Sequence, residues 1–374
     1  MEFGLSLPGR GPFATLDTVL KIATRAEALR FSSLFVTDHI VLPVKTDASI
    51  YPYAASGRFP GGSQQDYLEP LVLLGYLAHV TRTLRLGTSV LVIPYRNPLL
   101  TAKMLAMIDV LSRGRLILGA GTGWLKEEFE AVGAPPFEER GRVTDEYLSL
   151  MRRVWTTDPV TFEGRYATVR EVHALPKPAQ RGGIPIWIGG HTDAALRRAA
   201  RLGDGWHPIG LRPPALLYPD EYGTRVAQLQ AYARQAGRDP RAITLSFRAP
   251  MEVRGPRDRA PAGERPLFQG TAAEVASDIR RYQSLGVTHF VFDPVRPALG
   301  KVLASMERFA HDVLPKLKTG RRHPAARSTS INRKSERSHA APSSSPINRK
   351  NERSRPAPRT GHPRSKPASR PPIQ

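Results

Sequence analysis

Along the first 318 residues, short apolar runs alternate with amphipathic segments at a nearly regular interval. The apolar runs are rich in Val, Ile, Leu and Phe and are bounded by Gly, Pro, Asp or Thr, which is typical of strands. They are nearly continuous rather than alternating in polarity, as expected for a parallel sheet that is covered on both faces. The predicted strands are Phe3–Leu7, Leu34–Thr37, Leu84–Ile93, Leu116–Ala120, Ile186–Gly189, Gly205–Pro208, Ile243–Arg248 and Val287–Phe292.

Segments with helical periodicity lie between these strands. In the seventh of them, Val275, Ile279 and Tyr282 recur at steps of three and four and therefore share one face of a helix. Eight β-α repeats predict an α/β protein with a (β/α)8 TIM barrel over residues 1–318, while the pattern alone leaves an open doubly wound sheet as the alternative. The predicted helices are Leu16–Leu29, Glu69–His79, Leu99–Leu111, Arg142–Trp155, Asp193–Leu202, Asp220–Gln235, Ala272–Leu285 and Ala298–Val313.

Three connections are too long to be simple turns. Val41–Tyr67 and Gly121–Arg140 follow the second and fourth strands, so in a barrel they open at the C-terminal rim, where active sites are built. Tyr51 and Tyr53 in the first of them predict a lid or a pocket wall. The third connection, Thr157–Pro185, precedes the fifth strand and contains VTFEGRYATV, which predicts a small β-hairpin.

Residues 319–374 have a different composition. They are rich in Pro, Ser and Arg, and they contain two similar stretches, SINRKSERS and PINRKNERS. Their 14 Lys and Arg and two Glu account for +12 of the formal net charge of +22. Such a segment cannot bury enough apolar surface to order itself, so a basic disordered tail is predicted. A protein that works through this tail, by non-specific contact with polyanions or nucleic acid, is the alternative of another class, although the tail lacks aromatic residues for base stacking.

Composition also excludes several kinds of chemistry. The absence of cysteine rules out disulfides, thiolate metal sites and a cysteine nucleophile, and it fits a reducing, cytoplasmic setting. The start, MEFGLSLPGRG, has no basic segment followed by an apolar one, and no apolar run approaches the roughly 20 residues that span a bilayer. No motif has metal-ligand spacing, and no G-x-S-x-G motif supports a serine hydrolase.

Asp38 and His39 end the second predicted strand in the sequence FVTDH. A rigid strand tip can aim an imidazole at a reacting atom while a neighbouring carboxylate sets its tautomer or charge. The pair is therefore a candidate catalytic site. The alternative is a loop aspartate that binds backbone amides beside a surface histidine, and adjacent strand residues point to opposite sides unless the chain turns.

Other strand ends contain residues that form strands poorly. Residues 87–89 (GTS) interrupt the third strand, which predicts a bulge or a close approach of the backbone to a flat molecule, although a plain buried strand also explains most of it. The fourth strand runs into Gly-Thr-Gly at 121–123 and then Trp124, so a ring could approach the rim there. A dinucleotide fingerprint is not met, because its third glycine would fall at Trp124.

The fifth strand leads through GGHT at residues 189–192 into a helix. Amides at a helix N-terminus bind phosphate, but an ordinary capped turn fits equally, and Asp193 would repel a phosphate if its side chain pointed the same way. His207 ends the sixth strand, where it either packs beside Trp206 or lines a pocket.

Taken in order, these motifs resemble those of the luciferase-like monooxygenases, in the branch that uses the deazaflavin F420. The resemblance runs over about Met1–Leu317 and rests on FVTDH, LGTSVLVIPYRNPLLTAK, LSRGRLILGAGTGW, PKPAQRGGIPIWIGG and AARLGDGW, which are specific in their order and spacing. It implies a barrel with the deazaflavin ring at the C-terminal rim and hydride transfer between C5 of that ring and a small organic substrate. An FMNH2-dependent monooxygenase of the same fold is the alternative.

The resemblance also implies roles for single residues. His39 would be the acid, base or electrostatic partner of the substrate atom, and Asp38 would orient it or contact the cofactor. A bulge at residues 89–90, often with a non-proline cis peptide, would support the ring from behind. The implied cofactor-binding residues are Ser89, Val90, Gly121, Thr122, Gly123, Gly189, Gly190, His191 and Thr192, and the expected substrate-pocket residues are Tyr51, Tyr53, Trp124 and His207.

This chain departs from the pattern of the family at one position that bears on the identity of the substrate. F420-dependent sugar-phosphate dehydrogenases have a Glu after GTG as proton donor, whereas this chain has Trp124, which argues against that activity. Arg96 either attracts the anionic glutamyl chain of F420 or is an exposed, solvated residue. The sequence does not determine the oligomeric state, and it is compatible with a homodimer.

Overall fold

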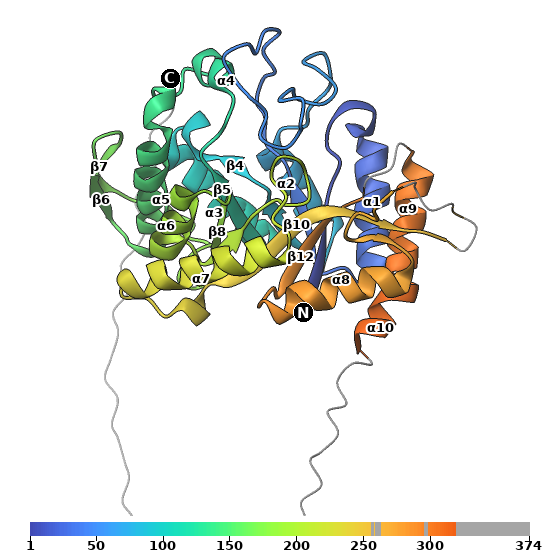
Figure 1. Cartoon of the computed structure of the whole chain (residues 1–374). Coiled ribbons are helices and arrows are strands. Elements are labelled where there is room, and N and C mark those ends of the chain that lie inside the picture. Colours follow the sequence, from blue (N-terminus) through green and yellow to red (C-terminus); the bar gives the residue numbers. More distant parts are fainter. Residues whose placement is uncertain (256–257, 259–262, 295–297, 319–374) are drawn as a thin grey trace, which may run out of the picture. The chain divides into compact units, whose positions relative to one another are not determined.

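The computed structural model describes residues 1–255, 258, 263–294 and 298–318. In these residues, eight parallel strands close into a barrel, because the last strand pairs with the first (Figure 1). The predicted TIM barrel is confirmed, and the open sheet is wrong. In barrel order the strands are β1 (Glu2–Ser6), β2 (Ser33–Val36), β3 (Arg85–Thr88), β5 (Leu116–Gly121), β8 (Ile186–Gly189), β9 (Gly205–His207), β10 (Thr244–Val253) and β12 (His289–Pro294).

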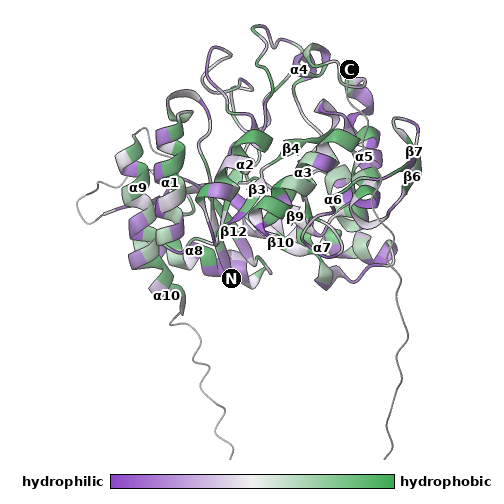
Figure 2. Cartoon of the chain, turned by 180° about the vertical axis from the view of Figure 1, so that it is seen from behind, coloured by the Kyte–Doolittle hydropathy of each residue, from purple (hydrophilic) through white to green (hydrophobic). Residues whose placement is uncertain are grey.

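Amphipathic helices cover the outside of the barrel, and Figure 2 shows hydrophilic and hydrophobic residues alternating along α1 and α5. Side-chain caps begin several of them: Thr15, Asn97 and Thr271 each accept from a backbone amide of the first turn. The helices are α1 (Leu16–Ala28), α2 (Pro70–Val80), α3 (Pro98–Ser112), α5 (Arg140–Thr156), α6 (Asp193–Leu202), α7 (Pro219–Gln235), α8 (Ala272–Ser284) and α9 (Leu299–Arg308), with a π-helical turn (Phe309–Val313) and α10 (Leu314–Lys318) after them.

Two apolar layers hold the barrel together. The larger core lies between the strands and the helices. A smaller one inside the barrel consists of Phe35, Ile117, Trp187 and Val291. Room for its rings comes from glycine on a neighbouring strand, because a Cβ at Gly87 would lie 2.5 Å from Phe35 Cε1. The barrel interior is therefore packed below the rim, as in other barrels of this type.

The long connections lie where the sequence places them. The hairpin before the fifth barrel strand is confirmed as β6 (Val160–Glu163) and β7 (Thr168–Val172). Residues 41–67 and 122–139 follow β2 and β5, and the second of these contains a helix that the sequence did not predict, α4 (Lys126–Ala131). Single-turn 3-10 helices occur at Gly11–Phe13, Ile93–Tyr95, Phe137–Glu139 and Pro240–Ala242.

Two strands differ from the prediction. The third one is interrupted after Thr88, and the chain resumes pairing as β4 (Leu91–Val92), so a break in the strand lies at the position where the sequence predicts a bulge or a close approach of the backbone. The seventh barrel strand, β10, is longer than predicted because it continues to pair with β12 and then with β11 (Gln269–Gly270). The tail predicted for residues 319–374 lies outside the described residues. Within the described ranges, no helix combines the length and apolar character needed to cross a membrane.

Candidate active site

A cavity of about 950 Å³ opens at the C-terminal ends of the barrel strands. This volume lies at the upper end of the range for small-molecule sites. The ends of β2, β3, β5, β8 and β9, a residue of β10 and both long insertions contribute to its wall. All fifteen residues singled out from the sequence line it: Asp38, His39, Tyr51, Tyr53, Ser89, Val90, Gly121, Thr122, Gly123, Trp124, Gly189, Gly190, His191, Thr192 and His207.

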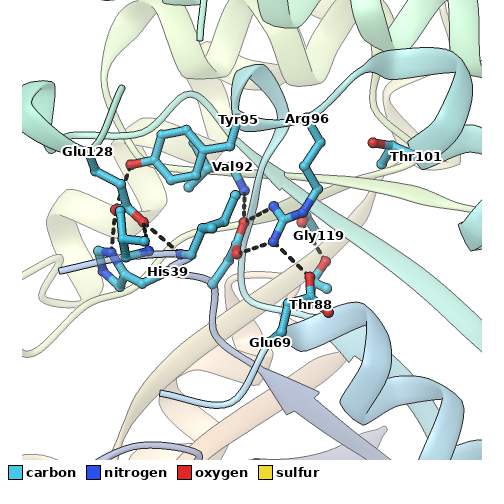
Figure 3. Close-up of polar contacts among 12 residues, drawn as sticks. His39, Glu69, Thr88, Val92, Tyr95, Arg96, Thr101, Gly119 and Glu128 are labelled. Carbon is cyan, nitrogen blue, oxygen red and sulfur yellow. Dashed lines mark hydrogen bonds and ion pairs between the residues drawn. The ribbon is translucent and has the colours of Figure 1, made fainter. Parts of the chain in front are cut away.

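The imidazole of His39 is held by the buried carboxylate of Glu128 on α4 (Figure 3). His39 Nδ1 lies 2.6 Å from Glu128 Oε2, and the hydroxyl of Tyr95 donates to the same oxygen across 2.9 Å. The other oxygen accepts from the backbone amides of Ile40 and Val41. Because an ionised carboxylate only accepts, Nδ1 carries the hydrogen and Nε2 is left for a ligand.

Asp38 has a different partner. Its carboxylate forms two hydrogen bonds of 2.8 Å with the guanidinium of Arg96 and accepts a third from the backbone amide of Val92. Burial raises the pKa of Asp38, and the hydrogen bonds from Arg96 oppose this rise. Asp38 therefore ties the end of β2 to the segment after β3, and the carboxylate bonded to His39 is that of Glu128.

Arg96 is neither a solvated residue nor a free cation. Its side chain is only 13% exposed, and it binds Glu69 across 2.8 Å in addition to Asp38. The expectation of an exposed, solvated residue is therefore wrong. Attraction of the glutamyl chain of F420 stays a prediction, which the pairing of Arg96 with two carboxylates does not favour.

His207 belongs to a buried network in which each proton can be assigned. Ser246 Oγ donates to the carbonyl oxygen of Trp206, so it must accept from His207 Nδ1, 2.6 Å away. His207 Nε2 then accepts from the Ser89 hydroxyl at 2.7 Å. Complete burial, and after it the charge of Arg248, lower the pKa of His207 to about 3, so the imidazole is neutral at pH 7.

The same network fixes the interrupted strand. Arg248 donates to both the carbonyl and the hydroxyl oxygen of Ser89. The peptide bond between Ser89 and Val90 is cis, as the resemblance implies for this segment. A Cβ at Gly189 would lie 2.7 Å from Val90 Cγ1, and one at Gly121 would clash with Val90 Cγ2. Both glycines are therefore needed to accommodate Val90.

The start of α6 forms another end of the cavity. Asp193 does not line it, because its carboxylate pairs with Arg197 and Tyr232. The predicted conflict between Asp193 and a bound phosphate is thus absent. His191 does line the cavity, and its Nδ1 is buried with no partner among the described residues. Burial lowers the pKa of His191, and its unpaired nitrogen favours a ligand that can bond to it.

Aromatic side chains surround His39 on the side of the first insertion. The ring centroids of Phe59, Tyr67 and Trp124 lie 5.0, 5.1 and 6.0 Å from the imidazole. Tyr51 packs edge-on against Phe59 and Trp124, at 5.2 and 5.1 Å. This aromatic wall, consisting of Tyr51, Phe59, Tyr67 and Trp124, packs beside His39, which is only 6% exposed.

Sequence reasoning missed Glu128, Tyr95 and Arg248. Arg248 could have been found, because it is a charge between the apolar residues Phe247 and Ala249 in the middle of a strand. Glu128 gave little signal, since its helix has only six residues and lies inside a long connection.

The family model described as luciferase-like monooxygenase matches residues 1–293 of the chain. An uncharacterized protein of Mycobacterium tuberculosis is 36% identical over 219 residues, which are 59% of this chain and 72% of that protein. An F420-dependent glucose-6-phosphate dehydrogenase of Intrasporangium calvum is 35% identical over 188 residues, which are 49% of this chain and 50% of that enzyme. The chain therefore matches about half the length of the dehydrogenase.

Two solved structures share the fold. The monooxygenase RslO1 from Streptomyces bottropensis has a TM-score of 0.67 and 23% identity, with 84% of this chain and 99% of that chain covered. An F420-dependent secondary alcohol dehydrogenase in complex with an F420-acetone adduct has a TM-score of 0.67 and 20% identity, with 84% and 98% covered. At these identities the likeness shows the barrel fold alone.

Proposed function

Because the chain belongs to the luciferase-like monooxygenase family, we propose that this oxidoreductase uses F420 and exchanges a hydride between the deazaflavin and a small organic substrate. The observation that carries the proposal is the His39–Glu128 pair, which leaves Nε2 of the imidazole toward a cavity of about 950 Å³. The F420-dependent dehydrogenases among the relatives support the choice of cofactor.

The residues around the cavity fit F420 on two counts. The unpaired Nδ1 of His191 and the first amides of α6 offer hydrogen bonds to the phosphate, with Gly190 and Thr192 beside them. Residues 89–90 and 121–123 form a wall against which the ring would lie. When bound, F420 supplies or accepts a hydride at C5 of its ring.

His39 handles the proton that accompanies the hydride. Glu128 keeps a hydrogen on Nδ1, so Nε2 accepts the hydroxyl proton of an alcohol that is oxidised, or returns one to a carbonyl that is reduced. The adjacent carboxylate stabilises the imidazolium that forms. Tyr95 and two backbone amides hold Glu128 in place, so the imidazole is oriented before the substrate binds. Asp38 is proposed to act through the position of the strand end.

The glucose-6-phosphate activity in the relatives' names is not proposed for this chain. Trp124 occupies the position where the resemblance to F420-dependent sugar-phosphate dehydrogenases implies a glutamate as proton donor. The aromatic wall that Trp124 joins instead favours a substrate with an apolar body.

The cofactor is tested by titrating the purified protein with F420 and, separately, with FMN while following fluorescence. Tight binding of F420 is expected, followed by bleaching with an alcohol or reoxidation of F420H2 with a ketone or activated alkene. His39→Asn should bind F420 as the natural chain does but lose turnover. Tight FMN binding without F420 binding would overturn the proposal in favour of an FMNH2-dependent monooxygenase, whose turnover consumes oxygen.

The cellular location and the assembly of the enzyme are proposed from its sequence. The lack of cysteine favours the cytoplasm, and a homodimer and polyanion contact by residues 319–374 stay predictions. Deleting residues 319–374 should leave F420 binding and turnover unchanged, whereas loss of both would favour function through the tail.

A further inference from the structure

The cavity contains a second charged group, which the proposed proton transfer does not use. It consists of Arg10, Arg212 and Arg248, which line the cavity, and the carboxylate of Asp293 at the end of β12. Arg248 Nε lies 2.9 Å from Asp293 Oδ1, and Arg212 Nη2 donates to Oδ2 across 2.8 Å. Two guanidinium groups therefore share one carboxylate.

This group has more positive than negative charge. Arginine stays protonated, so three cations stand against Asp293. Although burial opposes its ionisation, the charges of Arg248 and Arg212 lower the pKa of Asp293 to about 2. His207, which contacts the same network, adds no charge at pH 7. The group thus has two positive charges in excess.

No other carboxylate on the described cavity wall compensates for this excess. Asp38 and Glu138 are the acidic residues that line the cavity. Asp38 pairs with Arg96, and Glu138 lies 3.1 Å from the ammonium of Lys126. An anionic ligand would balance the charge.

Two of the arginines have donors to offer. Arg248 has the least to offer, because all three of its nitrogens already have partners: Nε and Nη2 contact Asp293, and Nη1 binds Ser89. Within the described part of the chain, the side chain of Arg212 donates to Asp293 through Nη2, and that of Arg10 donates to the carbonyl oxygen of Pro60 through Nη1. A guanidinium has five N–H donors, so both retain several for a ligand.

The charged group and the imidazole share one compartment. The guanidinium carbon of Arg10 lies 4.9 Å from the ring centroid of Phe59, which is 5.0 Å from that of His39. The two ends are therefore at most about 10 Å apart. The hydroxyl of Tyr51 is buried, which raises its pKa, and the charges of Arg248, Arg10 and Arg212 oppose that rise. Tyr51 thus lies within the field of all three cations.

We propose that the substrate is a planar organic anion whose charged group, a carboxylate or a phosphate, binds Arg10 and Arg212. Its flat body packs against Tyr51, Phe59 and Trp124, and its reacting carbon lies beside Nε2 of His39. The short span between Arg10 and His39 limits the body to about one aromatic ring. This inference rests on the proposed function, because it reserves the rest of the cavity for the cofactor.

The test uses the full chain, with and without saturating F420, and titrates it with benzoate, phenyl phosphate and the neutral benzamide by calorimetry. We expect the better anion to bind at least ~10-fold more tightly than benzamide, because hydrogen bonds to a charged group are stronger than those to a neutral one. Arg10→Gln and Arg212→Gln should each raise its Kd about 10-fold. Arg241→Gln, which removes an exposed arginine paired with Asp239, should leave it unchanged. The comparison of benzoate with phenyl phosphate identifies the charged group.

Equal Kd values for the two anions and benzamide, or unchanged anion binding in both cavity variants, would overturn the inference. The Kd of F420 is measured in every variant, and thermal melting confirms folding. Variants that weaken F420 but not the anion would assign the arginines to the cofactor and also refute the substrate subsite. Failure of the natural chain to bind F420 would refute the proposed function instead, and the titrations without F420 would still decide the subsite.

Discussion

Nδ1 of His39 lies 2.6 Å from the carboxylate of Glu128, a residue 89 positions later in the chain. The contact joins a rigid strand end to a short helix in an insertion, and it decides which nitrogen of the imidazole reaches the cavity. Glu128→Gln keeps the size of the side chain but replaces an accepting oxygen with a donating amide. We expect turnover to fall about 100-fold, within the usual range for lost acid-base catalysis.

The Kd of F420 should change little in Glu128→Gln, because Glu128 does not line the cavity. Glu130→Gln is the matched control, since Glu130 is an exposed residue of the same helix. The pH profile of kcat shows whether Glu128 takes part in the proton transfer or not. A profile that keeps its shape and height in Glu128→Gln would remove Glu128 from the mechanism.

The barrel could be predicted because each of its repeats obeys a local rule. Strands that are covered on both faces are nearly all apolar, and the helices between them are amphipathic, so a window of a dozen residues reveals each element. The closure of the sheet into a barrel was harder to predict from sequence, because the pairing of β12 with β1 joins residues almost 290 positions apart. Composition and periodicity do not encode such a contact.

The site could be predicted where chemistry interrupts a local pattern. Residues 87–89 form a strand poorly, and the strand is interrupted directly after Thr88. The role of Gly121 was less visible, because the residue that it accommodates, Val90, lies about 30 positions earlier, in the interruption between β3 and β4. Glu128 and Arg96 depend on side-chain pairs between distant segments, so their partners could only be found from the structure.

Val90 fits only because Gly121 and Gly189 have no side chains. In Gly121→Ala, the new Cβ would clash with Val90 Cγ2, so we expect a loss of stability of ~1–3 kcal/mol, the usual cost of overpacking. F420 binding should weaken as well, because the displaced segment forms part of the proposed ring site. Urea unfolding and F420 titration measure the two effects.

Gly75→Ala provides the contrast. Gly75 lies inside α2 with open space around its Cα, so alanine there should stabilise the protein by up to ~1 kcal/mol.

A second substitution at Val90 tests the cause of the clash. Val90→Ala should rescue much of the stability that Gly121→Ala loses. If the double variant is as unstable as the sum of the single ones, Val90 is not the cause of the clash.

The Asp38–Arg96 pair should matter for stability more than for chemistry. Asp38 is fully buried, and removing one member of a buried ion pair costs about 3–5 kcal/mol. Asp38→Asn should therefore lower the free energy of unfolding by ~3 kcal/mol, while Asp38→Leu with Arg96→Met should cost less than the sum of its parts. Arg241→Met, at an exposed pair, should cost less than ~0.5 kcal/mol.

The turnover of an Asp38 variant tests whether this residue has a role in catalysis. Folded Asp38→Asn should retain turnover within about 10-fold of the natural chain, because Glu128 rather than Asp38 contacts the imidazole. A loss as complete as that in His39→Asn, in protein that still binds F420, would assign Asp38 to the catalytic step.

His207 makes the stability of the barrel depend on pH. Its pKa is lowered to about 3 in the folded chain, whereas the ordinary value is 6.5. Below pH 6.5 the unfolded chain takes up a proton that the folded chain refuses, so stability is complete above pH 6.5 and is lost as the pH falls toward 3. Between pH 7 and 5, His207 should cost about 2 kcal/mol of unfolding free energy.

His207→Gln removes this proton, and the slope of unfolding free energy against pH should become shallower, although the variant is less stable at pH 7. Part of the slope should remain, because burial also lowers the pKa of His289. His79→Gln, at an exposed histidine of α2, should keep the slope of the natural chain. Urea unfolding at several pH values measures all three proteins. An unchanged slope in His207→Gln would mean that His207 is protonated in the folded barrel, which contradicts the hydrogen bond that its Nε2 accepts from Ser89.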